Sequence, residues 1–138
     1  MATTNRERVE KGFQALRQGL VPYAEREMKK HVGPKWADGV DARSRFGLER
    51  ESDGRVQWDT SGLLKAMIDN WQTVFRQTLG HFERSLVSEL LEFRNKWAHE
   101  QPFSSDDALR ALDSMQRLLQ AVSAADAAAE IEASKVEL

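Results

Sequence analysis

The stretch that decides the fold is GHFERSLVSELLEFRNKWAHEQP, residues 80–102. At about 100° per residue, Val87 near 140° and Leu91 near 180° extend the apolar surface of this stretch, and five other apolar side chains fall within roughly 80° of arc on one side of a helix. These five side chains are Phe82, Leu86, Leu90, Phe93 and Trp97. Pro102 cannot extend a helix and disfavours helical geometry at the residue before it. The sequence therefore predicts an amphipathic helix from about residue 80 that buries this stripe and ends before Pro102.

The end of this predicted helix carries the polar sequence RNKWAH, residues 94–99. Helical geometry places Arg94, Asn95 and His99 on the shoulder beside the stripe, where one small pocket could collect all three. Asn95 and His99 are also separated by four residues, which brings their side chains within reach of each other. These three residues are our candidate catalytic residues.

The three residue types suit the cleavage of RNA without a metal ion. An imidazole such as that of His99 exchanges protons near neutral pH, so it can take the proton from a ribose 2′-hydroxyl. The guanidinium of Arg94 matches the oxygens of the attacked phosphate, and Asn95 can orient either group. A structural alternative stays open: Arg94 pairs with Glu83 or Asp113, Asn95 caps backbone groups, and His99 simply ends a helix.

The rest of the chain also shows helical patterns. Apolar residues at helical spacing predict a first helix over about residues 4–17, and Gly19 and Pro22 predict a break before a short second helix that ends near residue 31. Asp59 or Thr60 can cap a third helix whose apolar face continues to Gly80. In it we expect Trp71 and Phe75 to be core residues. The third helix is followed by the one described above.

Ser104 can cap the last main helix, with Asp107 three residues further on. Its expected stripe comprises Leu109, Leu112, Met115, Leu118, Leu119 and Val122. Residues 33–58 lack a helical period and predict a long connection with a short hairpin around residues 52–54. The fold class is thus all-α: an antiparallel bundle of four main helices plus a short helix.

The length of 138 residues suits one domain with its own core. We place this domain at residues 1–125. Residues 126–138 are an Ala-rich extension with helical propensity and no Gly or Pro terminator. We expect this extension to be the truncated start of a connection to a missing C-terminal region.

Composition restricts the possible functions. There is no cysteine, so a disulfide framework, a thiolate metal site and a cysteine nucleophile are excluded. The three histidines lie far apart in sequence, so we expect no bound metal and no cofactor. No apolar run of about 18 residues and no signal-peptide pattern is present, which predicts a cytoplasmic protein without membrane contact. The net charge of −2 argues against a general nucleic-acid coat protein.

A basic cluster of Lys29, Lys30, His31 and Lys35 stands out from this nearly neutral background. Cations are favoured at the C-terminal end of a helix, where they meet the negative end of its dipole. We therefore interpret this cluster as the solvated end of a helix.

The RNKWAH sequence and its flanking segments resemble the HEPN superfamily. Its members are all-helical and carry Arg, a polar residue, a few more residues and then His at the end of one helix; RNKWAH fits this pattern with four residues between Arg94 and His99. The likeness covers about residues 5–125 and is to the Swt type, which is shared by an RNA-surveillance endonuclease and the N-termini of large bacterial ATPase proteins. The resemblance implies a homodimer in which two motifs meet in one composite site.

Two functions follow from this resemblance. The first is an RNA-directed domain, a metal-independent endoribonuclease acting as a dimer, at the N-terminus of a bacterial defence or surveillance ATPase. The alternative is a non-catalytic dimerisation and docking module. Some relatives are nucleotide-modified on a tyrosine two positions beyond the motif histidine, but that position is Gln101 here and the only tyrosine is Tyr23.

Overall fold

The computed structural model describes residues 3–41 and 44–138 and confirms the all-α class. Five α-helices account for most of these residues: α1 (Asn5–Val32), α2 (Thr60–Asp69), α3 (His81–Ala98), α4 (Ser105–Ala121) and α5 (Ala125–Val136). Two short 3-10 helices, η1 (Trp36–Gly39) and η2 (Phe75–Gln77), lie in the connections. The described residues contain no strand, only two isolated β-bridges.

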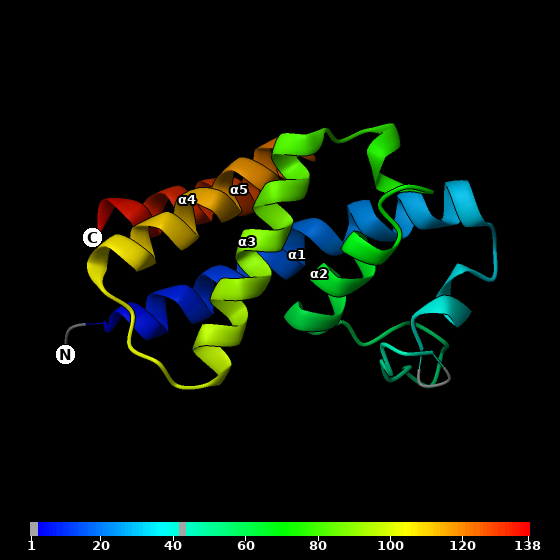
Figure 1. The fold of residues 1–138 in the computed structure, drawn as a ribbon, viewed down its shortest axis with the longest axis horizontal. Helices are drawn as coiled ribbons and strands as arrows, with labels where there is room; N and C mark the ends of the chain where they lie inside the picture. Colours follow the sequence, from blue (N-terminus) through cyan, green and yellow to red (C-terminus); the bar gives the residue numbers. More distant parts are fainter. Residues whose placement is uncertain (1–2, 42–43) are drawn as a thin grey trace.

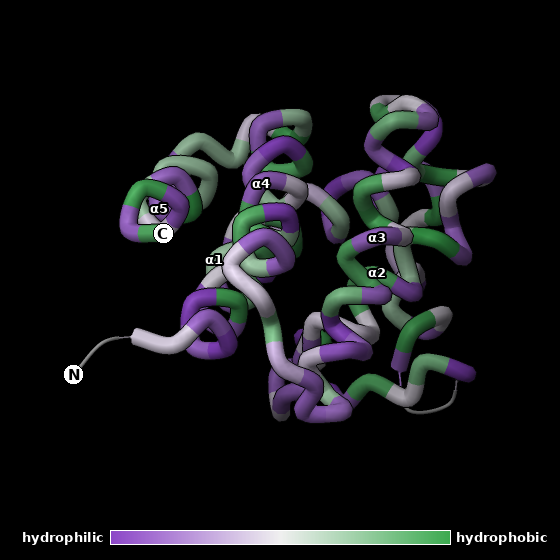
Figure 2. The backbone as a smooth tube through the Cα atoms, turned by 60° about the vertical axis from the view of Figure 1, so that its left-hand side comes forward, coloured by the Kyte–Doolittle hydropathy of each residue, from purple (hydrophilic) through white to green (hydrophobic). Residues whose placement is uncertain are grey.

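The helices form two groups that share one core. α1, α4 and α5 pack on one another, and α2 packs on α3 (Figure 1). Contacts of α3 with α4 and of α1 with α2 join the two groups. Figure 2 shows these groups side by side, with α1, α4 and α5 on one side and α2 and α3 on the other. α3 therefore contacts helices of both groups. The candidate site was predicted at the C-terminal end of this helix.

The prediction of two short helices before residue 32 was wrong, because α1 is one helix of 28 residues with Pro22 inside it. Proline has no N–H to donate to the carbonyl of Gln18, but Pro22 lies on the exposed side of α1, where water can bind that carbonyl. Gly19 does not break the helix either. A Cβ there would lie 2.8 Å from the Cβ of Ala127, so this glycine lets α5 approach closely. The Thr4 hydroxyl caps the start of the helix by accepting from the N–H of Glu7.

The prediction that the third helix continues to Gly80 was also wrong. Asp59 caps α2 as expected, accepting from the N–H of Gly62, but α2 ends at Asp69. Asn70 closes the helix and donates to the carbonyl of Ala66 with both its backbone N–H and its side-chain amide; local side-chain bonds of this kind compete with continuation of a helix. The segment beyond it is nevertheless buried, since Trp71 and Phe75 are 4% and 0% exposed, and their assignment to the core is confirmed.

The two predicted apolar stripes are correct for most positions but not for all. Phe82 at the start of α3 is 56% exposed and Leu109 on α4 is 43% exposed, so neither is a core residue. Trp97 is half-buried and does not lie in the middle of a buried face. Val87, which the helical wheel placed outside the stripe, is fully buried. The buried face of α3 is therefore rotated from Phe82 towards Val87, since α3 contacts both α2 and α4.

The Ala-rich segment at residues 125–136 is a helix of its own. Ser123 has a φ of 63°, which turns the chain between α4 and α5. Ala127, Ala128 and Ile131 are buried in the same core as α1 and α4. These residues thus pack against the helices of the predicted domain.

The long connection predicted at residues 33–58 is confirmed for residues 33–41 and 44–58, and residues 42–43 lie outside the described part of the chain. A turn at residues 51–54 joins the antiparallel bridge between Arg50 and Val56, where the short hairpin was expected. Val40, Leu48 and Val56 pack with Ala66 of α2 in a second, smaller apolar cluster. The connection is therefore packed onto α2.

Candidate functional site

The end of α3 positions the candidate histidine. His99 is the residue that closes the helix, and Glu100 follows with a φ of 58°, a left-handed conformation that is uncommon outside glycine. The N–H of Gln101 then donates to the carbonyl of Lys96, and the N–H of Glu100 to that of Trp97. This pair of bonds is the Schellman arrangement, which satisfies the last carbonyls of a helix. His99 is left exposed at the tip.

The loop after His99 is held to the neighbouring helices. The amide of Asn5 donates to the carbonyl of Phe103, and the guanidinium of Arg6 donates to the carbonyl of Gln101. Lys96 donates to the carboxylate of Asp107 in the first turn of α4, at 2.6 Å. This hydrogen bond holds the pKa of Asp107 below its usual range. The position of the helix end is thus set by α1 and α4.

Arg94 is half-buried and lies between two small cavities. The first, of about 130 Å³, is formed with α1, the start of α2 and Trp97. The second, of about 220 Å³, is formed with the start of α2 and the connection, through Asp59, Lys65 and Phe46. A guanidinium in this place can reach an anion that enters either cavity.

Asn95 and His99 do not line either of these cavities. Both are exposed, and the only bond between them is from the backbone N–H of His99 to the backbone carbonyl of Asn95. The structure therefore brings the three residues to one end of α3, without collecting them in one pocket of a single protomer.

The structural alternative for Arg94 is wrong. The carboxylate of Glu83 accepts from the backbone N–H of Gly80, and that of Asp113 accepts from Arg117 and Lys135. Within the ranges 3–41 and 44–138, the side chains of Arg94, Asn95 and His99 form no hydrogen bond or ion pair. For His99, the description as a residue that ends a helix is accurate.

The basic cluster was predicted to be the solvated end of a helix, and the structure confirms this for Lys29, Lys30 and His31. They occupy the last turn of α1, and the imidazole of His31 lies 3.7 Å from the carboxylate of Glu27. Among described residues there is no group of three or more His, Cys, Asp or Glu that could hold a metal ion. None of the described helices combines the length and the apolar character needed to cross a membrane.

The sequence did not reveal which residues from other elements surround Arg94. Arg17 of α1 donates to the hydroxyl of Thr60 at 2.7 Å, and Arg45 and Lys65 line the second cavity. Arg45 forms an ion pair with Asp69. No spacing along the chain indicates these neighbours, because the fold brings them together.

The chain forms a helical bundle, and one of its helices ends in Arg-Asn, three further residues and His. These are the defining features of a HEPN domain. Comparison with protein families identifies the particular family, because the model described as Swt1-like HEPN matches residues 11–123. The chain therefore belongs to the Swt1-like HEPN family. Searches of curated proteins and of solved structures gave no match.

Proposed function

We propose that this HEPN domain is directed to RNA and acts as a metal-independent endoribonuclease in a homodimer. Membership of the HEPN family suggests an RNA-related function. The observation that carries the catalytic proposal is that Arg94, Asn95 and His99 lie at one helix end without side-chain partners among the described residues. Buried polar groups are normally hydrogen-bonded, and half-buried Arg94 has no such partner in the described part of the chain, so its guanidinium is available to a ligand; Asn95 and His99 are exposed beside it.

Each residue has a defined role in the proposed reaction. The imidazole of His99 takes the proton of a ribose 2′-hydroxyl, and the resulting oxygen attacks the adjacent phosphorus. Arg94 stabilises the charge on the phosphate oxygens, and Asn95 orients the imidazole or the phosphate. The bond from phosphorus to the 5′-oxygen breaks, and this oxygen takes up the proton from the His99 imidazolium and leaves as a hydroxyl, which restores the neutral imidazole. The products carry a 2′,3′-cyclic phosphate and a 5′-hydroxyl.

The dimer in this proposal completes the site. Because His99 does not line the cavities beside Arg94, one protomer presents only part of the machinery. A two-fold interface formed by α3 and residues 94–102 brings the motifs of two protomers together. Spare apolar surface at Val87 no longer supports this interface, since Val87 is buried within the protomer. Sedimentation that shows only monomer at roughly 100 μM would contradict the dimer.

The catalytic proposal is tested by cleavage of single-stranded RNA in EDTA. We expect Arg94→Ala and His99→Ala each to lower kcat/KM by at least about 100-fold, and Asn95→Ala to have a smaller effect. His81→Ala and Arg84→Ala are matched controls, because both side chains are exposed at the opposite end of α3. Circular dichroism checks the fold of each variant. Cleavage that survives in His99→Ala would refute the assigned role.

The competing function is a non-catalytic dimerisation and docking module. It predicts a stable dimer that cleaves no RNA, even when joined to a C-terminal ATPase region and supplied with nucleotide. The resemblance to the N-termini of large bacterial ATPase proteins leads us to propose such a region as the functional partner. That context corresponds to bacterial defence or RNA surveillance.

A further inference from the structure

A groove extends from the motif across the connection to α2, and we call it the Arg94 groove. It consists of the two cavities that share Arg94 and Asp59, and of a third cavity of about 300 Å³ that shares Arg45, Phe46 and Lys65 with the second. Neighbouring cavities share lining residues, so the three cavities lie next to one another along this surface. The groove leads away from the end of α3, and apart from Arg94 and Trp97 it is lined by residues outside the motif.

The second and third cavities are bordered by cations. Arg45 and Lys65 line both cavities, and Arg94 lines the second. The carboxylate of Asp59 is engaged in capping α2, where it accepts from the N–H of Gly62 at 2.6 Å. The ion pair of Arg45 with Asp69 is solvent-exposed, so a phosphate can compete with it at small cost. Lys65 has no side-chain partner among the described residues.

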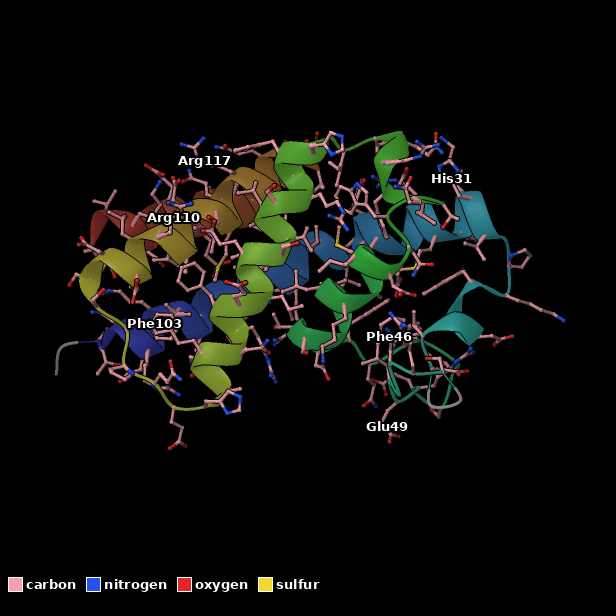
Figure 3. The ribbon with its side chains drawn as sticks, in the orientation of Figure 1. His31, Phe46, Glu49, Phe103, Arg110 and Arg117 are labelled. Atoms are coloured by element: carbon pink, nitrogen blue, oxygen red, sulfur yellow. The ribbon has the colours of Figure 1, made fainter. Side chains whose placement is uncertain are left out.

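Half-exposed aromatic rings line the cavities on both sides of Arg94. Trp97 lines the first cavity and Phe46 lines the second and third. The guanidinium of Arg45 lies 5.2 Å from the centroid of the Phe46 ring. Figure 3 labels Phe46 next to α2, on the connection that packs there. Cations along a groove, alternating with aromatic faces, are the combination that binds single-stranded nucleic acid by its phosphates and bases.

We infer that the Arg94 groove binds single-stranded RNA, with Arg45 and Lys65 holding backbone phosphates and Phe46 stacking on a base. This inference rests on the proposed function in that it takes RNA as the ligand of the motif. It adds a binding subsite outside the motif, which positions the strand so that one phosphate lies at Arg94. An acidic protein segment would use the same cations, but it offers no planar base for Phe46.

The test measures equilibrium binding of a 2′-O-methyl oligoribonucleotide by fluorescence anisotropy at several salt concentrations. This probe lacks the 2′-hydroxyl nucleophile, so it cannot be cleaved by the proposed reaction. We expect Lys65→Ala to weaken binding and to reduce the slope of log K against log salt by about 0.7, the value for one phosphate contact on a single strand. Phe46→Leu keeps an apolar side chain, and we expect about tenfold weaker binding with an unchanged slope. Phe46→Tyr retains the ring and should restore the affinity.

Lys30→Ala is the matched control for Lys65→Ala. It removes one exposed cation next to His31, at the C-terminal end of α1, and should leave both the affinity and the slope unchanged. Equal weakening by Lys30→Ala and Lys65→Ala would overturn the inference, because it would show attraction to net charge only. Equal affinity of the wild type for duplex RNA or polyglutamate would also overturn it.

The outcomes separate this inference from the proposed cleavage. If the wild type cleaves RNA but the groove variants bind and cleave normally, the groove inference fails and the catalytic proposal survives. If the wild type binds the probe in the predicted way but cleaves nothing, the groove stands and catalysis falls. If the wild type does not bind the probe at all, the groove inference is refuted directly.

Discussion

Replacing Gly19 with alanine should loosen the contact between α1 and α5. A Cβ at this position would lie 2.6 Å from the Cδ2 of Leu119, 2.8 Å from the Cβ of Ala127 and 3.0 Å from the Cβ of Ala124. The two alanine methyl groups are fixed to the backbone, so α5 has to move. Alanine gains about 1 kcal/mol in helix propensity over glycine, whereas overpacking costs about 1–3 kcal/mol. Because the alanine methyl groups cannot rotate away, we take the upper part of this cost, about 2–3 kcal/mol, and expect a net loss of about 1–2 kcal/mol.

Gly12→Ala is the matched control within the same helix. Its Cβ would meet Cδ2 of Leu112 at 2.7 Å and the sulfur of Met115 at 2.8 Å. Both atoms belong to flexible side chains and not to the backbone, so a small shift of these side chains can relieve the clash, whose cost should largely cancel the propensity gain and leave a change within about 1 kcal/mol.

Urea unfolding followed by circular dichroism measures both free energies of unfolding, and the melting temperature should change by about 4 °C per kcal/mol. If Gly19→Ala is as stable as the wild type or more stable than Gly12→Ala, α5 does not pack on α1 as closely as described.

Two further predictions concern the packing of two tryptophan side chains and the loss of stability at low pH. Trp71→Ala should cost about 3–5 kcal/mol, and Trp97→Ala clearly less because that ring is half-buried; equal losses in urea unfolding would refute the difference. The carboxylate of Glu89 accepts from Arg110 and Ser114, which holds its pKa below the ordinary 4.5. The ionised Glu89 carboxylate therefore stabilises the folded state above pH 4.5, and this stabilisation is lost as the pH falls through the lower folded-state pKa of Glu89. Glu89→Gln should therefore flatten the loss of stability in acid, and parallel acid-unfolding profiles would contradict this.

The sequence was sufficient where local patterns control the structure. The caps at Asp59 and Ser104 and the end of α3 before Pro102 lie where the residue types indicate. Pro22 shows the limit of such patterns. Its ring fits a helix when the unpaired carbonyl can reach water, and only the fold reveals which side of α1 is exposed.

The candidate site was predictable in part, for the same reason. The spacing of Arg94 and His99 in RNKWAH, with a helix-ending proline after it, placed both at the end of α3. The neighbours of Arg94 come from residues 17, 45 and 65, on three other segments. Their arrangement depends on how α2 and the connection pack, which no local spacing encodes.

The packing of α1 also has a consequence for the protein while it is being made. α1 is synthesised first, yet most of its helix contacts are with α4 and α5, which leave the ribosome about a hundred residues later. Until then its apolar face, including Leu16 and Leu20, has few partners and is available to a chaperone or to another nascent chain. The bundle can therefore close only after α4 and α5 have been synthesised. Substitutions that weaken α5 will reduce the yield of folded protein more than their equilibrium cost suggests.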